Sequence, residues 1–329
     1  MLDEITPNVT FRLAAMGLTS AFGAGLQTAL TALRDSEQHA LRRHDGFFNA
    51  GFEQQTLALP KGRDPENDTL RFPDLLAEAI DDLMTQHAAP LEPLHLVMLS
   101  PEGAEGMSAY LQMAAERVSS VWPVATTSVH DAGGAPGLAD WLAHAAPPLA
   151  QRGMSVIVLA VDSLCTPARL RSLDTQNKLF SRRMPWGLIP GEGAAALLLL
   201  SDSQPGLRFL RAATALEAVV EFSDEDTDFA AMSHAAGNVL GDAPRLWVSD
   251  WNNSRYRASQ LAHAILRVGG NATVLHPAAR FGDCGAVFGP LAIVSALAHP
   301  DYAMDPVVIS ASNGTGLCGC FSFAFVLAP

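Results

Sequence analysis

The chain has 329 residues, of which 49% are hydrophobic and 17% charged, and its formal net charge is −13. This length and apolar fraction allow a large buried core, and a composition dominated by Ala, Leu, Gly and Val suits packed α/β layers. The negative charge argues against a nucleic-acid partner, because binding to phosphates depends on clustered Lys and Arg.

Short apolar runs alternate with helical patterns in the first part of the chain. A segment of about 36–72, rich in charge, Gly and Pro, is expected to be a surface insertion. The apolar runs predict strands at residues 11–17, 94–99, 154–161 and 195–200, and the helical spacing predicts helices at 104–118 and 137–153.

The second part of the chain repeats this plan. Strands are predicted at residues 245–249, 272–275, 306–310 and 320–327, and helices at 254–270 and 289–299. Both parts end in the order helix, strand, turn, strand. We therefore predict an α/β protein with two similar halves, residues 1–202 and 203–329.

Cysteine usage and the N-terminal residues bear on location. All four cysteines follow residue 160 and form no disulfide-like ladder, which is typical of a reducing compartment. The opening "MLDEITPNVT" has no basic region of a secretory signal, and no apolar run approaches the length of a membrane span. We expect a cytoplasmic protein without a membrane span.

Four segments carry a resemblance to a known family. They are "AAMGLTSAFGAG", "VIVLAVDSL" followed by "WGLIPGEGAAALLL", "FGDCGAVFGPLAIVSAL" and "SASNGTGLCGCFSFAFV". In this order and spacing the chain resembles the β-ketoacyl synthases of the thiolase superfamily. The resemblance implies a thiolase-like fold with duplicated halves in αβαβα layers, and a homodimer that pairs through residues 123–129.

The resemblance also implies where the chemistry would lie. The family uses a cysteine thiolate at the N-terminus of a buried helix, with two histidines. The cysteine aligns near Gly134, and no cysteine lies between residues 1 and 164. Trp251 or Asn252 takes the place of the first histidine, Asp283 that of the second, and Ala278 that of a loop lysine. All four chemical positions therefore depart from the family pattern.

The architectural positions of the family are retained. Glu192 lies between two glycines ahead of a buried strand, where its carboxylate would accept hydrogen bonds and have a structural role. The glycine-rich loop contributes Gly316, Leu317 and Gly319, which we expect to shape a pocket. Retained glycines without the catalytic set are typical of a pseudoenzyme or of an enzyme with relocated chemistry.

Other side chains offer alternative chemistry. His130 could act as a base with Ser128 nearby, although neighbouring side chains on an extended segment point apart. Cys284 and Cys318 could be reactive thiols, and with Cys320 they could bind zinc, but buried packing is the favoured interpretation. We expect no metal and no cofactor.

Two polar segments precede helical runs in the second half. Asp250 and Asp283, with Asn252 and Asn253, could line a polar pocket, although helix capping by such residues is the favoured interpretation.

We expect a catalytically degenerate ketosynthase-like protein that acts as a binding, adaptor or partner subunit. Its partner would be a condensing-enzyme subunit, an acyl carrier or an effector from a bacterial secretion cluster. The alternative is an active acyltransferase or thioester hydrolase whose nucleophile is Ser128, Cys284 or Cys318.

Overall fold

The computed structural model describes residues 11–35, 37–60, 63, 71–90, 92–221, 223, 225, 227–240, 244–268, 271–302 and 305–327. The strands are β1 Arg12–Ser20, β2 Gly23–Ala24, β3 Leu41–Phe48, β4 Gln54–Ala58, β5 Leu94–Leu99, β6 Val124–His130, β7 Ser155–Ser163, β8 Glu192–Leu200, β9 Gly206–Leu216, β10 Leu246–Ser249, β11 Thr273–Leu275, β12 Val307–Ser312 and β13 Leu317–Val326. The helices are α1 Leu26–Arg34, α2 Arg71–Gln86, α3 Met107–Ser119, α4 Gly137–Asp140, α5 Ala146–Gln151, α6 Pro167–Thr175, α7 Ala230–Val239, α8 Arg255–Val268, α9 Ala278–Phe281 and α10 Phe288–Ala298.

The predicted apolar strands are confirmed. Residues 94–99 form β5, and the runs predicted at 154–161 and 195–200 form β7 and β8. All nine residues of β7 are buried, which suits a strand covered by helices on both faces. The predicted helices at 104–118, 254–270 and 289–299 are α3, α8 and α10.

The helix predicted at 137–153 is continuous but irregular. It consists of α4, a π-helical turn at Trp141–Ala145 (η1) and α5. Prolines occupy the first positions of α5. A proline has no N–H to donate to the preceding turn, which accounts for the wider turn at this point.

The described strands form one large mixed sheet and a separate hairpin. The sheet order is β11-β10-β12-β13-β9-β1-β8-β7-β5-β6, and β2 pairs with β1. From β1 outward the pairings are antiparallel, antiparallel, parallel and parallel, and from β9 outward they follow the same sequence. The two halves meet through the antiparallel contact of β1 with β9.

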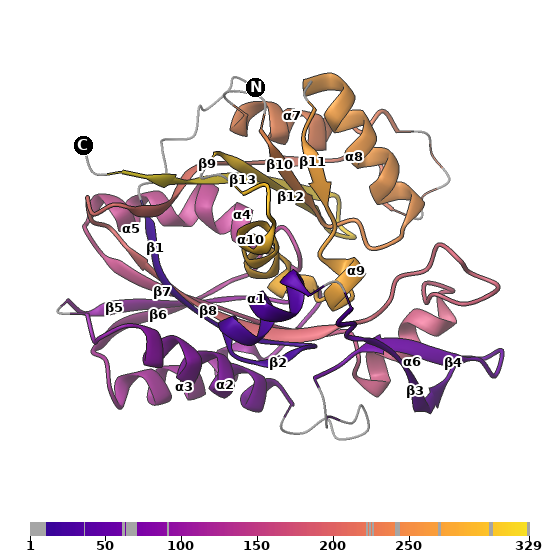
Figure 1. The fold of residues 1–329 in the computed structure, drawn as a ribbon, viewed down its shortest axis with the longest axis horizontal. Helices are drawn as coiled ribbons and strands as arrows, with labels where there is room; N and C mark the ends of the chain where they lie inside the picture. Colours follow the sequence, from indigo (N-terminus) through magenta and orange to yellow (C-terminus); the bar gives the residue numbers. More distant parts are fainter. Residues whose placement is uncertain are drawn as a thin grey trace.

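Helices cover the sheet in layers (Figure 1). The strands of the first half pack on α2 and α3 at their outer face, and those of the second half pack on α7 and α8. Between the halves lies the largest apolar cluster, which includes Leu138 of α4, Trp141 of η1 and Leu291 of α10. This is the α/β layering expected of the thiolase-like fold.

The segment expected to be a surface insertion contributes to the interior. Its residues 36, 61, 62 and 64–70 lie outside the described residues, and β3 and β4 form a hairpin in the remainder. Leu57 is buried against Leu170 and Leu179, and the N–H of Ala58 donates to Pro190 O at 2.9 Å. Apolar residues at the end of β4 therefore anchor this hairpin to the core.

Strand β9 and helix α7 had no sequence prediction. Buried and half-buried positions are mixed along β9, and Arg208 and Arg211 interrupt its apolar pattern. Helix α7, "AAMSHAAGNV", consists largely of small residues that match no amphipathic stripe. Among the described residues, no helix is long and apolar enough to cross a membrane.

Candidate functional site

A cavity of about 910 Å³ lies at the carboxyl ends of the parallel strands. Loops that follow β5, β6, β10 and β12 reach it, as does the segment between β11 and α10. Its polar lining includes Glu102, Asp162, Arg169, Glu221, Asn252, Ser254, Arg257, Asp283 and Ser312. Ligands of open α/β sheets bind at this end of the strands, which makes the cavity the candidate site.

Gly134 lies in the cavity wall in a conformation that favours glycine. Its φ is +72°, and its N–H donates to Ser100 O at 3.0 Å. A Cβ at this position would lie 3.3 Å from the Cβ of Glu102. The Glu102 side chain therefore covers the space in front of Gly134, near which the sequence resemblance places the cysteine.

Gly314 provides room for the same glutamate. A Cβ on Gly314 would lie only 2.6 Å from Glu102 Oε1. The loop that carries Gly314 is held beside Gly133, because Asn313 Nδ2 donates to Gly133 O at 2.9 Å. The loops that carry Gly134 and Gly314 thus leave a gap that the Glu102 carboxylate fills, and a side chain at either glycine would occupy part of it.

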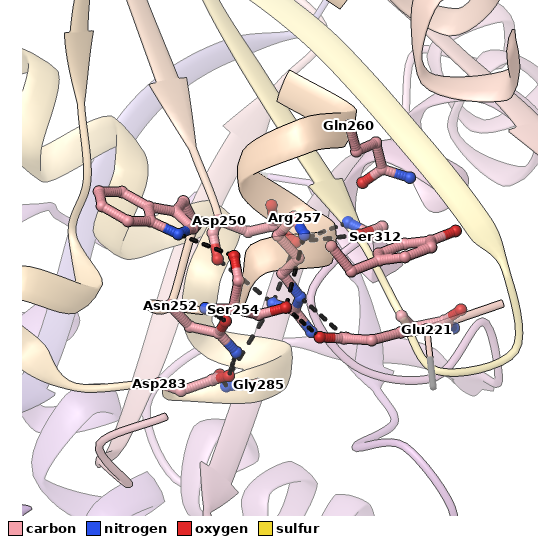
Figure 2. Close-up of polar contacts among 12 residues, drawn as sticks. Glu221, Asp250, Asn252, Ser254, Arg257, Gln260, Asp283, Gly285 and Ser312 are labelled. Atoms are coloured by element: carbon pink, nitrogen blue, oxygen red, sulfur yellow. Dashed lines mark hydrogen bonds and ion pairs between the residues drawn. The ribbon is translucent and has the colours of Figure 1, made fainter. Parts of the chain in front are cut away.

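Asn252 and Asp283 meet in the cavity (Figure 2). Asn252 Nδ2 donates to Asp283 Oδ2 at 2.5 Å, and Asn252 Oδ1 accepts from Ser254 N at 3.3 Å. Asp283 Oδ1 accepts from Gly285 N at 3.0 Å. The structure therefore brings together the two residues that the sequence resemblance assigns to the histidine positions, and they bond to each other.

Arg257 is the cation at the centre of this polar group (Figure 2). Its Nη1 lies 3.1 Å from Asp250 Oδ2 and 3.9 Å from Asp283 Oδ2, and its Nε lies 3.6 Å from Glu221 Oε2. Burial would lower the pKa of Arg257, but the surrounding carboxylates, led by Asp250, raise it above its usual value. The guanidinium is therefore permanently charged.

Two carboxyl groups of the site have raised pKa values. Burial raises the pKa of Asp250 to about 6, against the lowering effects of Arg257 and of the N–H of Ser312. Burial likewise raises the pKa of Asp162 to about 6, against Arg169 and the N–H of Ala286. Both groups change charge close to neutral pH.

Gly285 allows Asp162 to lie at the base of the cavity. A Cβ on Gly285 would lie 2.0 Å from Asp162 Oδ2, and the residue has a φ of +48°. The neighbouring N–H of Ala286 donates to that same oxygen at 3.0 Å. Glycine at this position thus lets the backbone contact the carboxylate directly.

Trp251 and Ala278 do not line the cavity in the described part of the chain. The indole Nε1 of Trp251 donates to Ser254 O at 3.0 Å, and its ring packs edge-on against His276, with the centroids 4.7 Å apart. Ala278 begins the short helix α9. Asn252 rather than Trp251 therefore occupies the cavity position.

The candidate thiols are buried away from the cavity lining. Cys284 donates to Phe281 O, and burial raises its pKa well above the usual value. Burial raises the pKa of Cys318 to about 12, and Gln260 donates to its sulfur. A thiol with such a pKa has little thiolate at neutral pH, which disfavours nucleophilic attack.

Ser128 and His130 lie on β6 and have different partners. Ser128 Oγ lies 2.9 Å from His95 Nε2, whose other ring nitrogen lies 2.7 Å from Thr126 Oγ1. His130 Nε2 lies 2.9 Å from Asp140 Oδ2. The two residues therefore do not form a pair with each other, and neither lines the cavity among the described residues.

Glu192 is fully buried outside the cavity lining. Its Oε2 lies 2.8 Å from Arg71 Nε and accepts from Ser163 Oγ at 2.8 Å. This ion pair joins the first residue of β8 to the first residue of α2. The geometry is that of an internal structural contact.

Gly316, Leu317 and Gly319, expected to shape a pocket, are not among the described residues that line the cavity. Gly316 has a φ of +87°, and a Cβ there would lie 2.7 Å from Glu217 O. Leu317 pairs with Leu216 of β9, and a Cβ on Gly319 would lie 2.8 Å from the Cβ of Ala139 in α4. These residues fix the approach of β13 to the central helices.

Three charged residues of the site had no sequence signal. Glu102 lies in a Gly-rich loop, Glu221 follows β9, and Arg257 is one of two arginines in the N-terminal turns of α8. Such residues are normally solvated, and only the folded arrangement places them around one cavity.

Comparisons with known proteins identify the fold. No family model matches the chain, and no curated protein matches it. Among solved structures, the chain is similar to the ishigamide ketosynthase/chain length factor, with 15% identity, a TM-score of 0.69, and coverage of 96% of this chain and 99% of that one. It is also similar to a chain of AntDE:AntF, a type II PKS acyl-carrier protein in complex with its ketosynthase, with 12% identity, a TM-score of 0.76, and coverage of 97% and 100%.

A third similar structure is a β-ketoacyl synthase from Burkholderia phymatum STM815, with 14% identity, a TM-score of 0.70, and coverage of 96% of this chain and 99% of that one. At this level of identity the likeness concerns the fold, and it extends over nearly the whole of each chain. The chain therefore has the fold of these ketosynthase structures, the thiolase-like fold.

Proposed function

We propose that this chain is a non-condensing, ketosynthase-like subunit that acts by binding a protein partner or an acyl carrier. The observation that carries the proposal is the inner end of the cavity. There Gly134 and the Glu102 side chain stand where the resemblance places the nucleophile, and Asn252 and Asp283 stand at the two histidine positions.

The chemistry of these groups supports binding rather than condensation. Condensation needs a thiolate beside an oxyanion site and neutral donors for the substrate carbonyl. Here the Glu102 carboxylate would repel an anion, and Asp283 is bonded to Asn252 and lies near Arg257. The cavity is thus large enough for a ligand, but Glu102 and Asp283 place carboxylates where condensation would need a thiolate and neutral donors.

The charge around the cavity supports a partner with an acidic surface. The chain as a whole has a net charge of −13, and acidic and basic side chains both line the cavity, with Arg169, Lys178 and Arg255 among the basic ones. Arg182 and Arg183 are exposed on the adjoining loop. Complementary charge would steer an acidic carrier or subunit to this side of the molecule.

Incubation with acetyl-CoA and malonyl-CoA tests the absence of covalent chemistry. We expect no covalent acyl adduct by intact-mass measurement and no loss of the malonyl carboxylate. An adduct that Ser128→Ala, Cys284→Ala or Cys318→Ala removes would contradict the proposal and support the alternative, an active acyltransferase or thioester hydrolase.

The binding part is tested with an acidic, phosphopantetheinylated acyl carrier protein in biolayer interferometry. Arg182→Glu combined with Arg183→Glu should weaken binding by about tenfold, mainly through slower association. Arg152→Glu, an exposed arginine at the end of α5, is the matched control. If the carrier does not bind, or if both variants weaken it equally, the carrier role is wrong.

We also propose that two copies pair through β6. This strand ends the sheet, and its residues 124–130 contain neither Pro nor Lys, the residues that usually protect an exposed edge. We expect a dimer by light scattering, and Thr127→Lys should convert it to a monomer because the antiparallel partner would carry the same charge. Thr273→Lys on β11, at the opposite edge, should leave the dimer intact. A monomeric wild-type chain would overturn this assignment.

A further inference from the structure

The segment between α6 and β8 has a narrow base and a compact tip. At the base, Leu179 and Leu188 form a bridge, and the N–H of Phe180 donates to Leu188 O at 2.9 Å. Within the tip, the N–H groups of Ser181 and Met184 each donate to the other's carbonyl oxygen at 3.1 Å. Figure 1 shows the segment beside α6. Residues 181–187, here called the tip loop, thus form a unit on a fixed base.

Gly187 fixes the base of the tip loop. A Cβ at this position would lie 2.3 Å from both the carbonyl carbon and the carbonyl oxygen of Leu179. The two backbones are therefore in contact at the base. Movement of the segment would therefore be confined to the part of the tip loop before Gly187.

Asn253 ties the tip loop to the second half of the chain. Its Nδ2 donates to Pro185 O at 2.7 Å and to Gly187 O at 3.0 Å. The residue has a φ of +83°, a left-handed conformation that asparagine tolerates better than most side chains do. The side-chain amide of Asn253 thus forms hydrogen bonds to two backbone carbonyl groups of the tip loop.

Arg255 makes a second contact with the tip loop. Its guanidinium carbon lies 4.3 Å from the centre of the Trp186 ring, a cation–π arrangement. Both side chains are exposed. The contact between the tip loop and the start of α8 is therefore polar and accessible to water, without a buried apolar seam.

The tip loop is a wall of the 910 Å³ cavity. Met184, Trp186 and Gly187 line one side, and Ser254, Arg255, Tyr256 and Arg257 line the side that follows Asn253. We propose that residues 181–187 are a lid over part of the mouth of this cavity, held in place by the Asn253 amide, by the stacking of Arg255 on Trp186 and by the hydrogen bond from the Arg182 N–H to Glu53 Oε2. Release of Asn253 opens the cavity while the Leu179 and Leu188 base stays in place.

The contacts of the lid suit repeated opening. A hydrogen bond that exchanges with water contributes only modestly to the closed state, and an exposed cation–π pair adds little more. Segments with few buried apolar contacts open at a small fraction of the global stability. The lid concerns access to the cavity and is independent of which ligand enters.

Thiol labelling measures lid opening directly. The four native cysteines are between 0% and 3% exposed, so their background reaction is slow. Ala135 is 7% exposed and lines the cavity, which makes Ala135→Cys a reporter inside it. Ser120→Cys, on the exposed C-cap of α3, is the reporter outside it. The reagent is methyl methanethiosulfonate, which is small and uncharged.

Asn253→Asp has nearly the same shape but loses both donors. With this change the labelling rate of the Ala135→Cys reporter should rise about tenfold, and that of the Ser120→Cys reporter should not change. Asn253→Gly keeps the left-handed conformation and also removes the amide, so it should give the same rise if the aspartate variant fails to fold. Unchanged labelling inside the cavity with both variants would overturn the lid. Because no acyl ligand is used, this outcome is separate from that of the proposed function.

Discussion

Arg257→Met should lower the free energy of unfolding by about 3 to 5 kcal/mol. The guanidinium lies within 4 Å of carboxylates from Asp250, Glu221 and Asp283, and its side chain is 11% exposed. Methionine fills much of the same volume but leaves these carboxylates without their shared cation. Chemical denaturation at pH 7, followed by circular dichroism, measures the loss.

A second substitution separates the loss of charge from the loss of packing. Asp250 is 5% exposed and is the nearest carboxylate to Arg257. Adding Asp250→Asn to Arg257→Met removes the most buried uncompensated charge, so it should restore about half of the lost stability. If the double variant is no more stable than Arg257→Met alone, the cost arises from packing and the electrostatic account is wrong.

The strands of the sheet illustrate what a sequence pattern can and cannot predict. Strands β5, β7 and β8 are continuous apolar runs, and burial on both faces requires such runs, so they were predicted closely. Strand β9 was missed because Arg208 and Arg211 break its apolar pattern: Arg211 is exposed, and Arg208 is partly buried beside Asp202. A pattern of hydrophobicity reports burial, and it fails where burial is partial.

The residues of the cavity were predicted in part for a similar reason. Asn252 and Asp283 were identified from the resemblance, and the structure brings them into contact. Glu102 fills the gap between the loop of Gly134 and the loop of Gly314, and these two loops are far apart in sequence. Helix capping, the favoured sequence interpretation for Asp283, accounts only for its bond to the N–H of Gly285. A local sequence pattern can therefore predict the hydrogen bond between Asp283 and the nearby Gly285, but not the hydrogen bond that Asp283 accepts from Asn252.

The free energy of unfolding of Asp162→Asn should increase relative to that of the wild-type chain as the pH rises from 4 to 7. Asp162 is 1% exposed, and burial raises its pKa from 3.8 to about 6. The folded chain therefore holds this proton more tightly than the unfolded chain does. The stability that the protonated carboxyl contributes is complete below about pH 4 and is lost as the pH rises through about 6. The shift corresponds to about 3 kcal/mol.

The measured quantity is the difference in unfolding free energy between Asp162→Asn and wild type at each pH, because other groups titrate in both chains. Asparagine is neutral at every pH and resembles the protonated acid, so this difference should move by about 2 kcal/mol in favour of the variant between pH 4 and pH 7. Asp301→Asn, at an exposed carboxyl, corrects for the change in net charge. A difference that stays constant with pH would contradict the raised pKa. A difference that moves as expected would mean that the charge at the base of the cavity changes near pH 6, so any ligand that contacts Asp162 would bind with a pH dependence centred there.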